Sequence, residues 1–383
     1  MSELHADPMA LLRTRTSAKW RAYGPDITPL WVAEMDYPLA TPIAVTLIDL
    51  IGRSDTGYDP SPAAYGESFA EFATDAWGWA PDPKRVLGAT DVSTAIVETV
   101  RQVAPGGKVI ITSPVYPPFF TTIVEGGAEV VDVPLLSDGP SDWRLDLDGI
   151  EAALQDGASA VLLCHPHNPI GHIHPREQLE ALAELAAANN AVVISDEVHA
   201  PLTHSDGEFV PFVTVSAAAS DVGITISSAS KAWNIAGLKS AFIVTDADTR
   251  AAERIATMPS AVHHRLSHFG VHASITAFRS SRAWLASAIA AIELNRHRLR
   301  EPLAEHLPDA VMHEPKAGYL VWIDLSALGW GDDPAARIQA GAKIAVNHGP
   351  AFGAGGAGHI RLNIACSPET LDDAVRRIAQ LRS

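Results

Sequence analysis

The sequence predicts an α/β fold of two lobes, in which a large domain with a mostly parallel sheet is followed by a smaller α+β domain. Short apolar runs rich in β-branched residues recur between about residues 85 and 245, and several lack the alternation of a half-exposed strand. Between two of these runs, residues 175–189 begin with proline and carry leucine at positions 179, 182 and 185, which is the pattern of an amphipathic crossover helix. Strand–helix–strand alternation is typical of a parallel sheet with helices on both faces.

The other elements follow in chain order. We expect the buried strands of the large domain at residues 108–112, 128–133, 158–164, 191–195, 223–227 and 241–245. From about residue 280 the pattern becomes that of a small α+β domain, with helices near 282–306, 335–341 and 371–381 around apolar strands at 318–324 and 359–365. We therefore assign residues 46–281 to the large domain, and residues 1–45 and 282–383 to the small domain with its N-terminal segment.

The composition disfavours several classes of protein. The 383 residues include 28 Lys and Arg against 45 Asp and Glu, and a net charge of −17 argues against binding to nucleic acid or an anionic membrane. Two cysteines, Cys164 and Cys366, cannot form a disulfide framework, so a reducing compartment is expected. The acidic N-terminus does not resemble a signal peptide, and no stretch reaches the roughly 18 apolar residues of a membrane helix. We expect a cytoplasmic globular protein without a nucleic-acid or membrane partner.

Three motifs suggest other functions, but each lacks its usual context. Residues 353–358 match G-x-G-x-x-G, yet a strand is expected after them instead of a helix, so a loop that positions Arg361 is favoured over a dinucleotide site. Residues 228–231 match the S-x-x-K of serine acyl-transfer enzymes without the accompanying S-D-N or K-T-G elements. Histidines at 165, 167, 172 and 174 surround a turn, with no Cys or carboxylate at ligand spacing, so no metal site is expected.

Residues with chemical potential follow the ends of successive predicted strands. Tyr116, Asn168, Asp196 and Lys231 each come after a different strand. Open α/β sheets bind ligands at the carboxyl ends of their strands, so these side chains are expected to meet at one edge. Each residue alone has a structural explanation, such as a packing aromatic or a helix cap. Such explanations do not readily account for all four residues following successive strand ends.

This set of residue types matches the needs of a pyridoxal phosphate site. An aromatic ring stacks on the cofactor, an amide binds its ring hydroxyl, and a carboxylate keeps its pyridine nitrogen protonated. A lysine binds the aldehyde covalently, because desolvation and cationic neighbours lower the pKa of the amine and free it as nucleophile and base. The sequence therefore predicts pyridoxal 5′-phosphate as cofactor and an amino acid as substrate.

The order of these motifs resembles the fold type I pyridoxal phosphate-dependent enzymes, the aspartate aminotransferase superfamily, from about Trp31 to the C-terminus. Three features are more similar to one branch, the C–S lyases of the MalY/PatB type, which are cystathionine β-lyase-like. These features are residues 31–38, His199 at a position where aminotransferases usually have tyrosine, and residues 230–239. The motifs that carry the resemblance are Asn168-Pro-Ile-Gly171, Asp196-Glu-Val-His199 and Ser228-Ala-Ser-Lys231, with Lys239 eight residues further on.

The resemblance implies a role for each matched residue. Lys231 would bind the cofactor and then move the Cα proton of the substrate, as the catalytic residue. Asp196 would pair with the ring nitrogen, Asn168 would bind the ring oxygen, and Tyr116 would stack on the ring and face the substrate. Arg361 would clamp the substrate carboxylate, a bidentate task that suits a guanidinium, beside the substrate-facing region of Trp31.

The resemblance also implies a phosphate site and a homodimer. The phosphate would bind at the N-terminus of a helix that begins near residue 91, where amides and the helix dipole favour an anion. Tyr58 matches a tyrosine that reaches the phosphate in the neighbouring subunit, which implies a homodimer with shared active sites. The expected cofactor-binding residues are Tyr58, Val92, Ser93, Tyr116, Asn168, Asp196, His199, Ser228, Ser230, Lys231 and Lys239.

The sequence departs from its relatives at three positions. Relatives often have glycine where Asp91 stands, and an acidic side chain beside a phosphate is repulsive unless it points away. Lys239 replaces an arginine that is common in aminotransferases, and Glu34 stands where the lyases usually have aspartate.

The resemblance to the lyases favours β-elimination. Lys231 would remove the Cα proton and the β-thiolate would leave; because a thiol has a pKa near ~8.5, the thiolate is a workable leaving group. Cystathionine or a related S-substituted L-cysteine would yield a thiol, pyruvate and ammonia. A class I/II aminotransferase shares the first half of this reaction and is the alternative. A cofactor-binding regulator would be expected to carry a DNA-binding module ahead of Trp31, where only about 30 residues stand.

Overall fold

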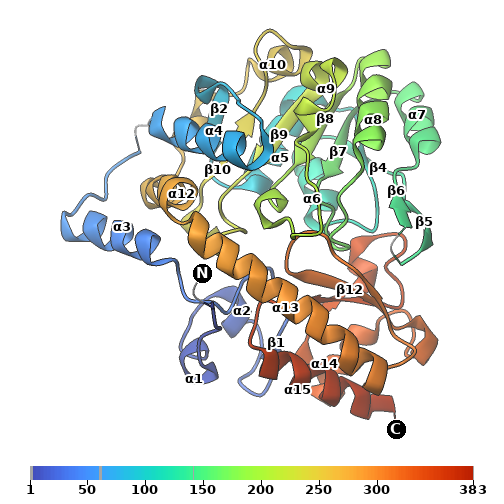
Figure 1. Ribbon diagram of the computed structural model, residues 1–383. Helices are drawn as coiled ribbons and strands as arrows, with labels where there is room; N and C mark the ends of the chain where they lie inside the picture. Colours follow the sequence, from blue (N-terminus) through green and yellow to red (C-terminus); the bar gives the residue numbers. More distant parts are fainter. Residues whose placement is uncertain (1–2, 60–62, 141, 383) are drawn as a thin grey trace.

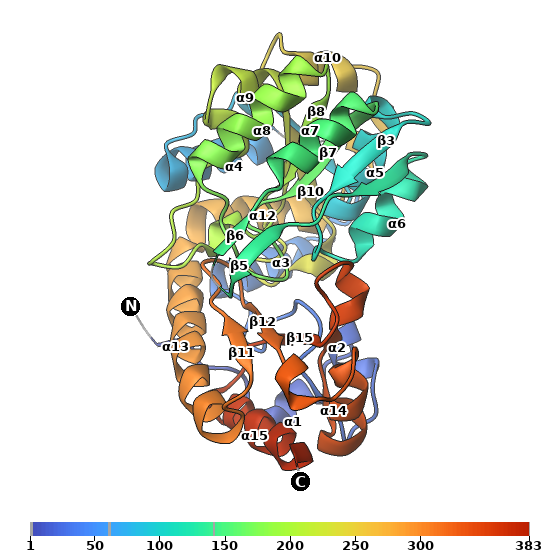
Figure 2. The ribbon, with the colours of Figure 1, turned by 90° about the vertical axis from the view of Figure 1, so that its right-hand side faces the viewer.

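The computed structural model describes residues 3–59, 63–140 and 142–382, which form two lobes (Figures 1 and 2). The large lobe is built on a seven-stranded sheet with the strand order β2-β10-β9-β8-β7-β3-β4. This is the α/β fold that the sequence predicts, with β2 as an additional strand. The strands are β2 Val86–Ala89, β3 Lys108–Ile111, β4 Glu129–Asp132, β7 Ala158–Cys164, β8 Val192–Asp196, β9 Gly223–Ser227 and β10 Ala241–Val244.

The central strands are buried on both faces, as their continuous apolar runs predict. On one face, Leu162 and Ile194 pack beneath helices α5, α6 and α10. On the other face, Val161 and Val193 pack beneath α4, α8, α9 and α12. The covering helices are α4 Ala63–Trp77, α5 Val92–Val103, α6 Pro118–Glu125, α7 Leu147–Gln155, α8 Arg176–Ala188, α9 Ala217–Val222, α10 Arg250–Ile255, α11 Ser260–His264 and α12 His268–Ser280.

Strand β10 is the antiparallel member of this mostly parallel sheet. It is antiparallel to both of its neighbours, β9 and β2, whereas the other pairs in this sheet are parallel. A parallel connection needs a crossover over the face of the sheet, but residues 228–240 stay at the carboxyl edge and turn directly back. That short return places Lys231 at the edge of the sheet.

The small lobe is an antiparallel four-stranded sheet with the order β11-β12-β15-β14. The long helix α13 runs across it, with α15 packed against α13 and α14 against α15 (Figure 1). The predicted helix at 282–306 is thus confirmed as α13, and the strand that follows the glycine-rich loop as β15. The elements are α13 Arg282–His306, α14 Pro334–Ala342, α15 Pro368–Ala379, β11 Val311–His313, β12 Leu320–Asp324, β14 Asn347–His348 and β15 His359–Asn363.

The N-terminal segment joins the small lobe. Strand β1 (Thr28–Pro29) pairs in parallel with β13 (Ile344–Ala345), and the short helices α1 (Met9–Leu12) and α2 (Ala18–Arg21) lie beside it. Helix α3 (Thr41–Gly52) then leads to the large lobe, and the hairpin β5 (Leu136–Gly139)–β6 (Asp142–Arg144) borders the small one (Figure 2). The domain limits at residues 45/46 and 281/282 stay a prediction. Within the described ranges, no helix is both long and apolar enough to cross a membrane.

Candidate active site

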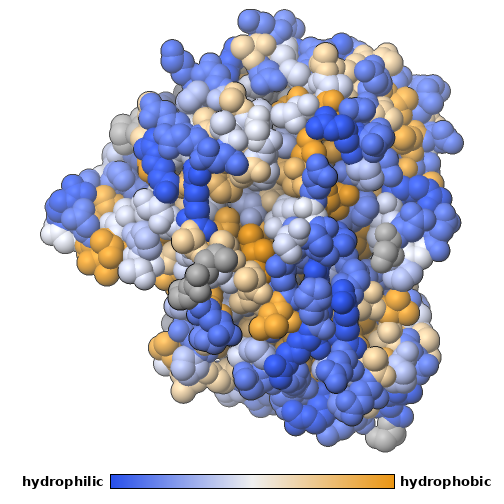
Figure 3. Space-filling model, in the orientation of Figure 1, coloured by the Kyte–Doolittle hydropathy of each residue, from blue (hydrophilic) through white to orange (hydrophobic). Residues whose placement is uncertain are grey.

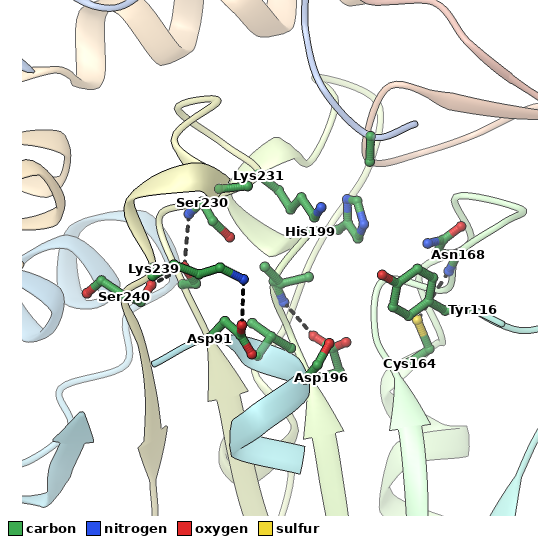
Figure 4. A pocket seen from close by; sticks show the side chains of 16 residues that line it. Asp91, Tyr116, Cys164, Asn168, Asp196, His199, Ser230, Lys231, Lys239 and Ser240 are labelled. Atoms are coloured by element: carbon green, nitrogen blue, oxygen red, sulfur yellow. Dashed lines mark hydrogen bonds and ion pairs between the residues drawn. The ribbon is translucent and has the colours of Figure 1, made fainter. Parts of the chain in front are cut away.

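A cavity of about 200 Å³ opens at the carboxyl edge of the large sheet (Figure 4). Its walls come from the ends of β2, β3, β7, β8 and β9 and the turns that follow them, as expected for an open α/β sheet. The expected residues that line it are Val92, Ser93, Tyr116, Asn168, Asp196, His199, Ser228, Ser230, Lys231 and Lys239. Ten side chains from distant parts of the chain are therefore brought to one place.

The amine of Lys231 reaches into this cavity from the turn after β9 (Figure 4). Burial and the nearby guanidinium of Arg361 lower the pKa of Lys231 to about 8. The uncharged fraction of this amine near neutral pH is therefore far larger than for an ordinary lysine, and the uncharged form is the one that acts as a nucleophile or a base. The neighbouring His199 is held neutral, because burial and the two cations lower its pKa to about 3.

Asp196 ends β8 at the floor of the cavity. Burial raises the pKa of its carboxyl group to about 6, and one of its oxygens accepts a hydrogen bond from the Val198 amide at 3.1 Å. Among the described residues, none donates a hydrogen bond to the second oxygen. A buried carboxylate with an open acceptor is suited to a cationic ring N–H.

Asn168 is oriented by Arg361. The Arg361 Nη1 atom donates to Asn168 Oδ1 at 2.9 Å, which leaves the two amide hydrogens of Asn168 for a ligand oxygen in the cavity. The Arg361 guanidinium is buried and also donates to Asn347 Oδ1 at 2.6 Å and to the Trp31 carbonyl at 3.3 Å. Its Nε atom is buried without a partner among the described residues.

The opposite end of the cavity is formed by the N-terminus of α5. Asp91 caps this helix, with Oδ1 accepting from the Thr94 amide at 2.8 Å, and its other oxygen accepts from Lys239 Nζ at 2.7 Å. The amides of Val92 and Ser93 have no protein acceptor in the described structure. The Ser228 hydroxyl donates to the Ser240 carbonyl at 2.6 Å, so its proton is already engaged.

Three expected residues, Trp31, Tyr58 and Arg361, do not line the cavity. Trp31 contacts the site through its carbonyl, which accepts from Arg361, while its indole packs edge-on against Tyr23 at 5.7 Å. Tyr58 is 100% exposed, outside the site of its own chain. Arg361 adjoins the cavity through Asn168.

A second set of residues positions the site and was not predicted. Asn234 clamps the backbone of Met35, accepting from its amide at 2.9 Å and donating to its carbonyl at 3.0 Å. Asn363 donates to the carbonyls of Val32 and Glu34 at 2.7 and 2.8 Å. Segment 31–36, whose Ala33 lines the cavity, is thus held by both lobes. Asn234 lies within the specific stretch 230–239, but its partner is 199 residues away and no pattern reveals it.

The donor set fits pyridoxal phosphate at both ends of the cavity. The unpartnered amides at the start of α5 and the Ser230 hydroxyl suit a phosphate, and the open acceptor of Asp196 and the amide hydrogens of Asn168 suit a hydroxypyridine ring. Tyr116, which is half-buried, supplies an aromatic wall.

The chain is similar over nearly its whole length to a known protein family and to several known proteins. The family described as aminotransferase class I and II matches residues 25–378. A Mycobacterium tuberculosis protein provisionally named cystathionine β-lyase is 38% identical over 393 residues, covering 96% of this chain and 94% of the relative. Cystathionine β-lyase PatB of Bacillus subtilis is 32% identical over 371 residues, covering 94% and 95%. A Corynebacterium diphtheriae structure, provisionally described as a pyridoxal phosphate-dependent β-cystathionase, superposes with a TM-score of 0.92 at 33% identity and 98% coverage of both chains.

Proposed function

The chain belongs to the aminotransferase class I and II family, and we propose that it is a pyridoxal phosphate-dependent carbon–sulfur β-lyase. Its substrate would be cystathionine or a related S-substituted L-cysteine, and its products a thiol, pyruvate and ammonia. The observation that carries the proposal is the meeting of Lys231, Asp196, Asn168 and Tyr116 around one cavity. The full-length relatives named cystathionine β-lyase support the choice of reaction.

The cofactor would be held by residues at both ends of the cavity. Its phosphate would bind at the start of α5 with Ser230, its ring oxygen at Asn168, and its ring nitrogen at Asp196, beside Tyr116. When bound, pyridoxal phosphate supplies an electron sink that makes the Cα–H bond of an amino acid acidic. The carboxylate of Asp196 would keep that sink charged, because a buried anion favours the protonated ring nitrogen.

The protein's own groups would then act on the substrate. Lys231 would take the Cα proton at Nζ, for which its lowered pKa of about 8 is suitable. Arg361 would hold the substrate carboxylate, and its contacts with Asn168 and Asn347 would fix the plane of the guanidinium. His199, held neutral by burial, would add no competing charge beside Lys231.

Pyruvate release tests this proposal directly. Purified protein loaded with pyridoxal phosphate is incubated with L-cystathionine and no keto acid, and pyruvate is followed over many turnovers. Sustained release is expected from the wild type, whereas Lys231→Ala should lose turnover and the absorbance of the covalently bound cofactor. Multiple turnovers by Lys231→Ala would refute the role of this lysine.

Transamination is the alternative reaction, favoured by the aminotransferase name of the matching family. An aminotransferase would use the same Lys231 for the first proton transfer but would need a keto acid to complete its cycle. A protein with bound cofactor that releases pyruvate from none of several S-substituted cysteines, yet turns over when a keto acid is added, would replace the lyase proposal with this one.

The active form would be a homodimer in the cytoplasm. Helix α3 carries an apolar stripe at positions i, i+3 and i+6, where Val45, Ile48 and Ile51 are 59%, 68% and 63% exposed. Figure 3 includes apolar surface over α3 where this helix projects from the body of the molecule. Tyr58 follows the helix closely in the chain, so a second copy that covers the stripe would also meet Tyr58.

Two buried, unpaired cysteines are consistent with a reducing compartment.

A further inference from the structure

Asp91 already accepts hydrogen bonds from two donors that the phosphate of an incoming cofactor would use. Its Oδ1 atom accepts from the Thr94 amide at 2.8 Å, and its Oδ2 atom accepts from the Lys239 ammonium at 2.7 Å (Figure 4). Both donors lie at the N-terminus of α5, where amides and the helix dipole favour an anion. The anion seated there in this structure is a side chain of the protein itself.

The remaining donors at this end of the cavity carry no formal charge. They are the Val92 and Ser93 amides and the hydroxyls of Ser93 and Ser230, and the described structure gives none of these groups an acceptor. Ser228 has its proton engaged by the Ser240 carbonyl. Lys239 is therefore the cation that the phosphate needs from this wall, and Asp91 neutralises it.

The Asp91 carboxylate and the cofactor phosphate would compete for Lys239, because both are anions. A phosphate monoester has its second pKa near ~6, so the cofactor phosphate is mainly a dianion at neutral pH. The carboxylate of Asp91 would repel it, and each contact that Lys239 makes with Asp91 is withdrawn from the phosphate. A glycine at this position would leave Lys239 without this partner.

We propose that Asp91 is a built-in competitor for the cofactor phosphate, which weakens cofactor binding and makes the occupancy of the site follow the supply of free pyridoxal phosphate. This inference rests on the proposed cofactor. It assigns to Asp91 a regulatory role in loading the site and no role in the reaction.

The test is a direct measurement of cofactor affinity. Asp91→Asn keeps an oxygen that can cap α5 and removes the charge, so Lys239 becomes available. Apoprotein is titrated with pyridoxal phosphate, and the absorbance of bound cofactor gives the dissociation constant; the loss of absorbance after dilution gives the release rate. We expect the variant to bind at least about tenfold more tightly and to release the cofactor more slowly.

A matched control is available in the same lobe. Asp146 caps α7 through the Gly149 amide at 3.0 Å and is half-buried like Asp91, so Asp146→Asn makes the same change in charge and cap away from the cavity. This control should leave the dissociation constant unchanged. An Asp91→Asn protein that binds no better than wild type, or binds more weakly, would overturn the competitor role.

The outcomes also separate this inference from the proposed function. If wild type and Asp91→Asn bind pyridoxal phosphate equally well, Asp91 is not a competitor, but the cofactor assignment stands. If wild type binds pyridoxal phosphate weakly and Asp91→Asn binds it tightly, both the cofactor assignment and the competitor role of Asp91 are supported. Failure of both proteins to bind pyridoxal phosphate would remove the cofactor assignment and this inference with it.

Discussion

At the scale of single residues, Arg361 shows how one side chain organises two parts of the site. Its guanidinium donates to the side-chain oxygens of Asn168 and Asn347 and lies 5.0 Å from the centre of the Phe352 ring. Because Asn168 has its oxygen bound in this way, its amide hydrogens are directed away from Arg361. We therefore expect substrate binding and the orientation of Asn168 to depend on the same planar fork.

Arg361→Lys should separate affinity from cofactor retention. Lysine keeps the charge but cannot hold Asn168, Asn347 and a substrate carboxylate in one plane, so KM for L-cystathionine should rise at least about tenfold while the cofactor stays bound. Steady-state kinetics and the absorbance of the bound cofactor measure the two effects. Arg250→Lys, a change at an ion pair with Asp221 in the large lobe, serves as the control. Unaltered kinetics would place the carboxylate elsewhere.

At the scale of elements, the turn from residue 165 to 174 is a buried cluster of histidines. The His174 ring lies 5.7, 5.4 and 5.0 Å from the rings of His165, His167 and His172. Burial holds all four neutral: it lowers the pKa of His165 to about 3 and those of His167 and His172 to about 4, and it lowers the pKa of His174 as well. The cluster lies behind Asn168 and supports the turn that carries it.

These histidines make the fold sensitive to acid. The unfolded chain binds protons at these side chains below pH 6.5, whereas the folded chain does not until about pH 4 or lower. The unfolded state therefore binds more protons in this window, and stability falls as the pH drops, by about 1.4 kcal/mol per pH unit for each proton.

Thermal unfolding between pH 4 and 7.5 measures this dependence. His172→Gln should reduce the slope between about pH 4 and 6.5, because one proton-binding group is lost from the unfolded chain without a new charge in the cluster. His264→Gln, at an exposed position, should leave the slope as in the wild type. Identical slopes for all three proteins would contradict the account.

Most of the helices and strands in the large lobe, and the long helix of the small lobe, could be predicted from the sequence. The buried strands, the amphipathic α8 and the long α13 follow from apolar periodicity and were predicted near their observed bounds. The mostly parallel sheet was predicted as observed, but the sequence did not indicate that β10 is its antiparallel strand, because periodicity reports burial and not strand polarity. β2 was missed: residues 86–89 are too short and too mixed in polarity to stand out as a strand.

At the scale of the whole molecule, the site lies where two lobes and the N-terminal segment meet. Asn234 of the large lobe and Asn363 of the small lobe hold segment 31–36 between them. The exposed stripe on α3 and the exposed Tyr58 are the parts that a second copy would complete. We expect the assembled dimer, and not one chain alone, to be the form that retains the cofactor best.

Ile48→Asp tests the dimer. A charge in the centre of the apolar stripe should shift sedimentation toward a monomer and weaken cofactor retention, because the partner's contribution through Tyr58 is lost. Tyr58→Phe should weaken retention without changing the mass. Val124→Asp, at a 62% exposed position on α6, should do neither. A wild-type monomer with full activity would contradict shared sites.

The sequence alone determined the class of fold, the strand ends that carry the chemistry and the identity of the residues gathered there. Local periodicity and short motifs record these features, since each depends on neighbours within a few positions in the chain. The tertiary structure decided which of those groups are available. The pairing of Asp91 with Lys239 joins positions 148 residues apart, and that of Asn168 with Arg361 joins positions 193 residues apart. The lowered pKa of Lys231 likewise depends on a desolvated cavity and a guanidinium from another lobe, which no local pattern encodes.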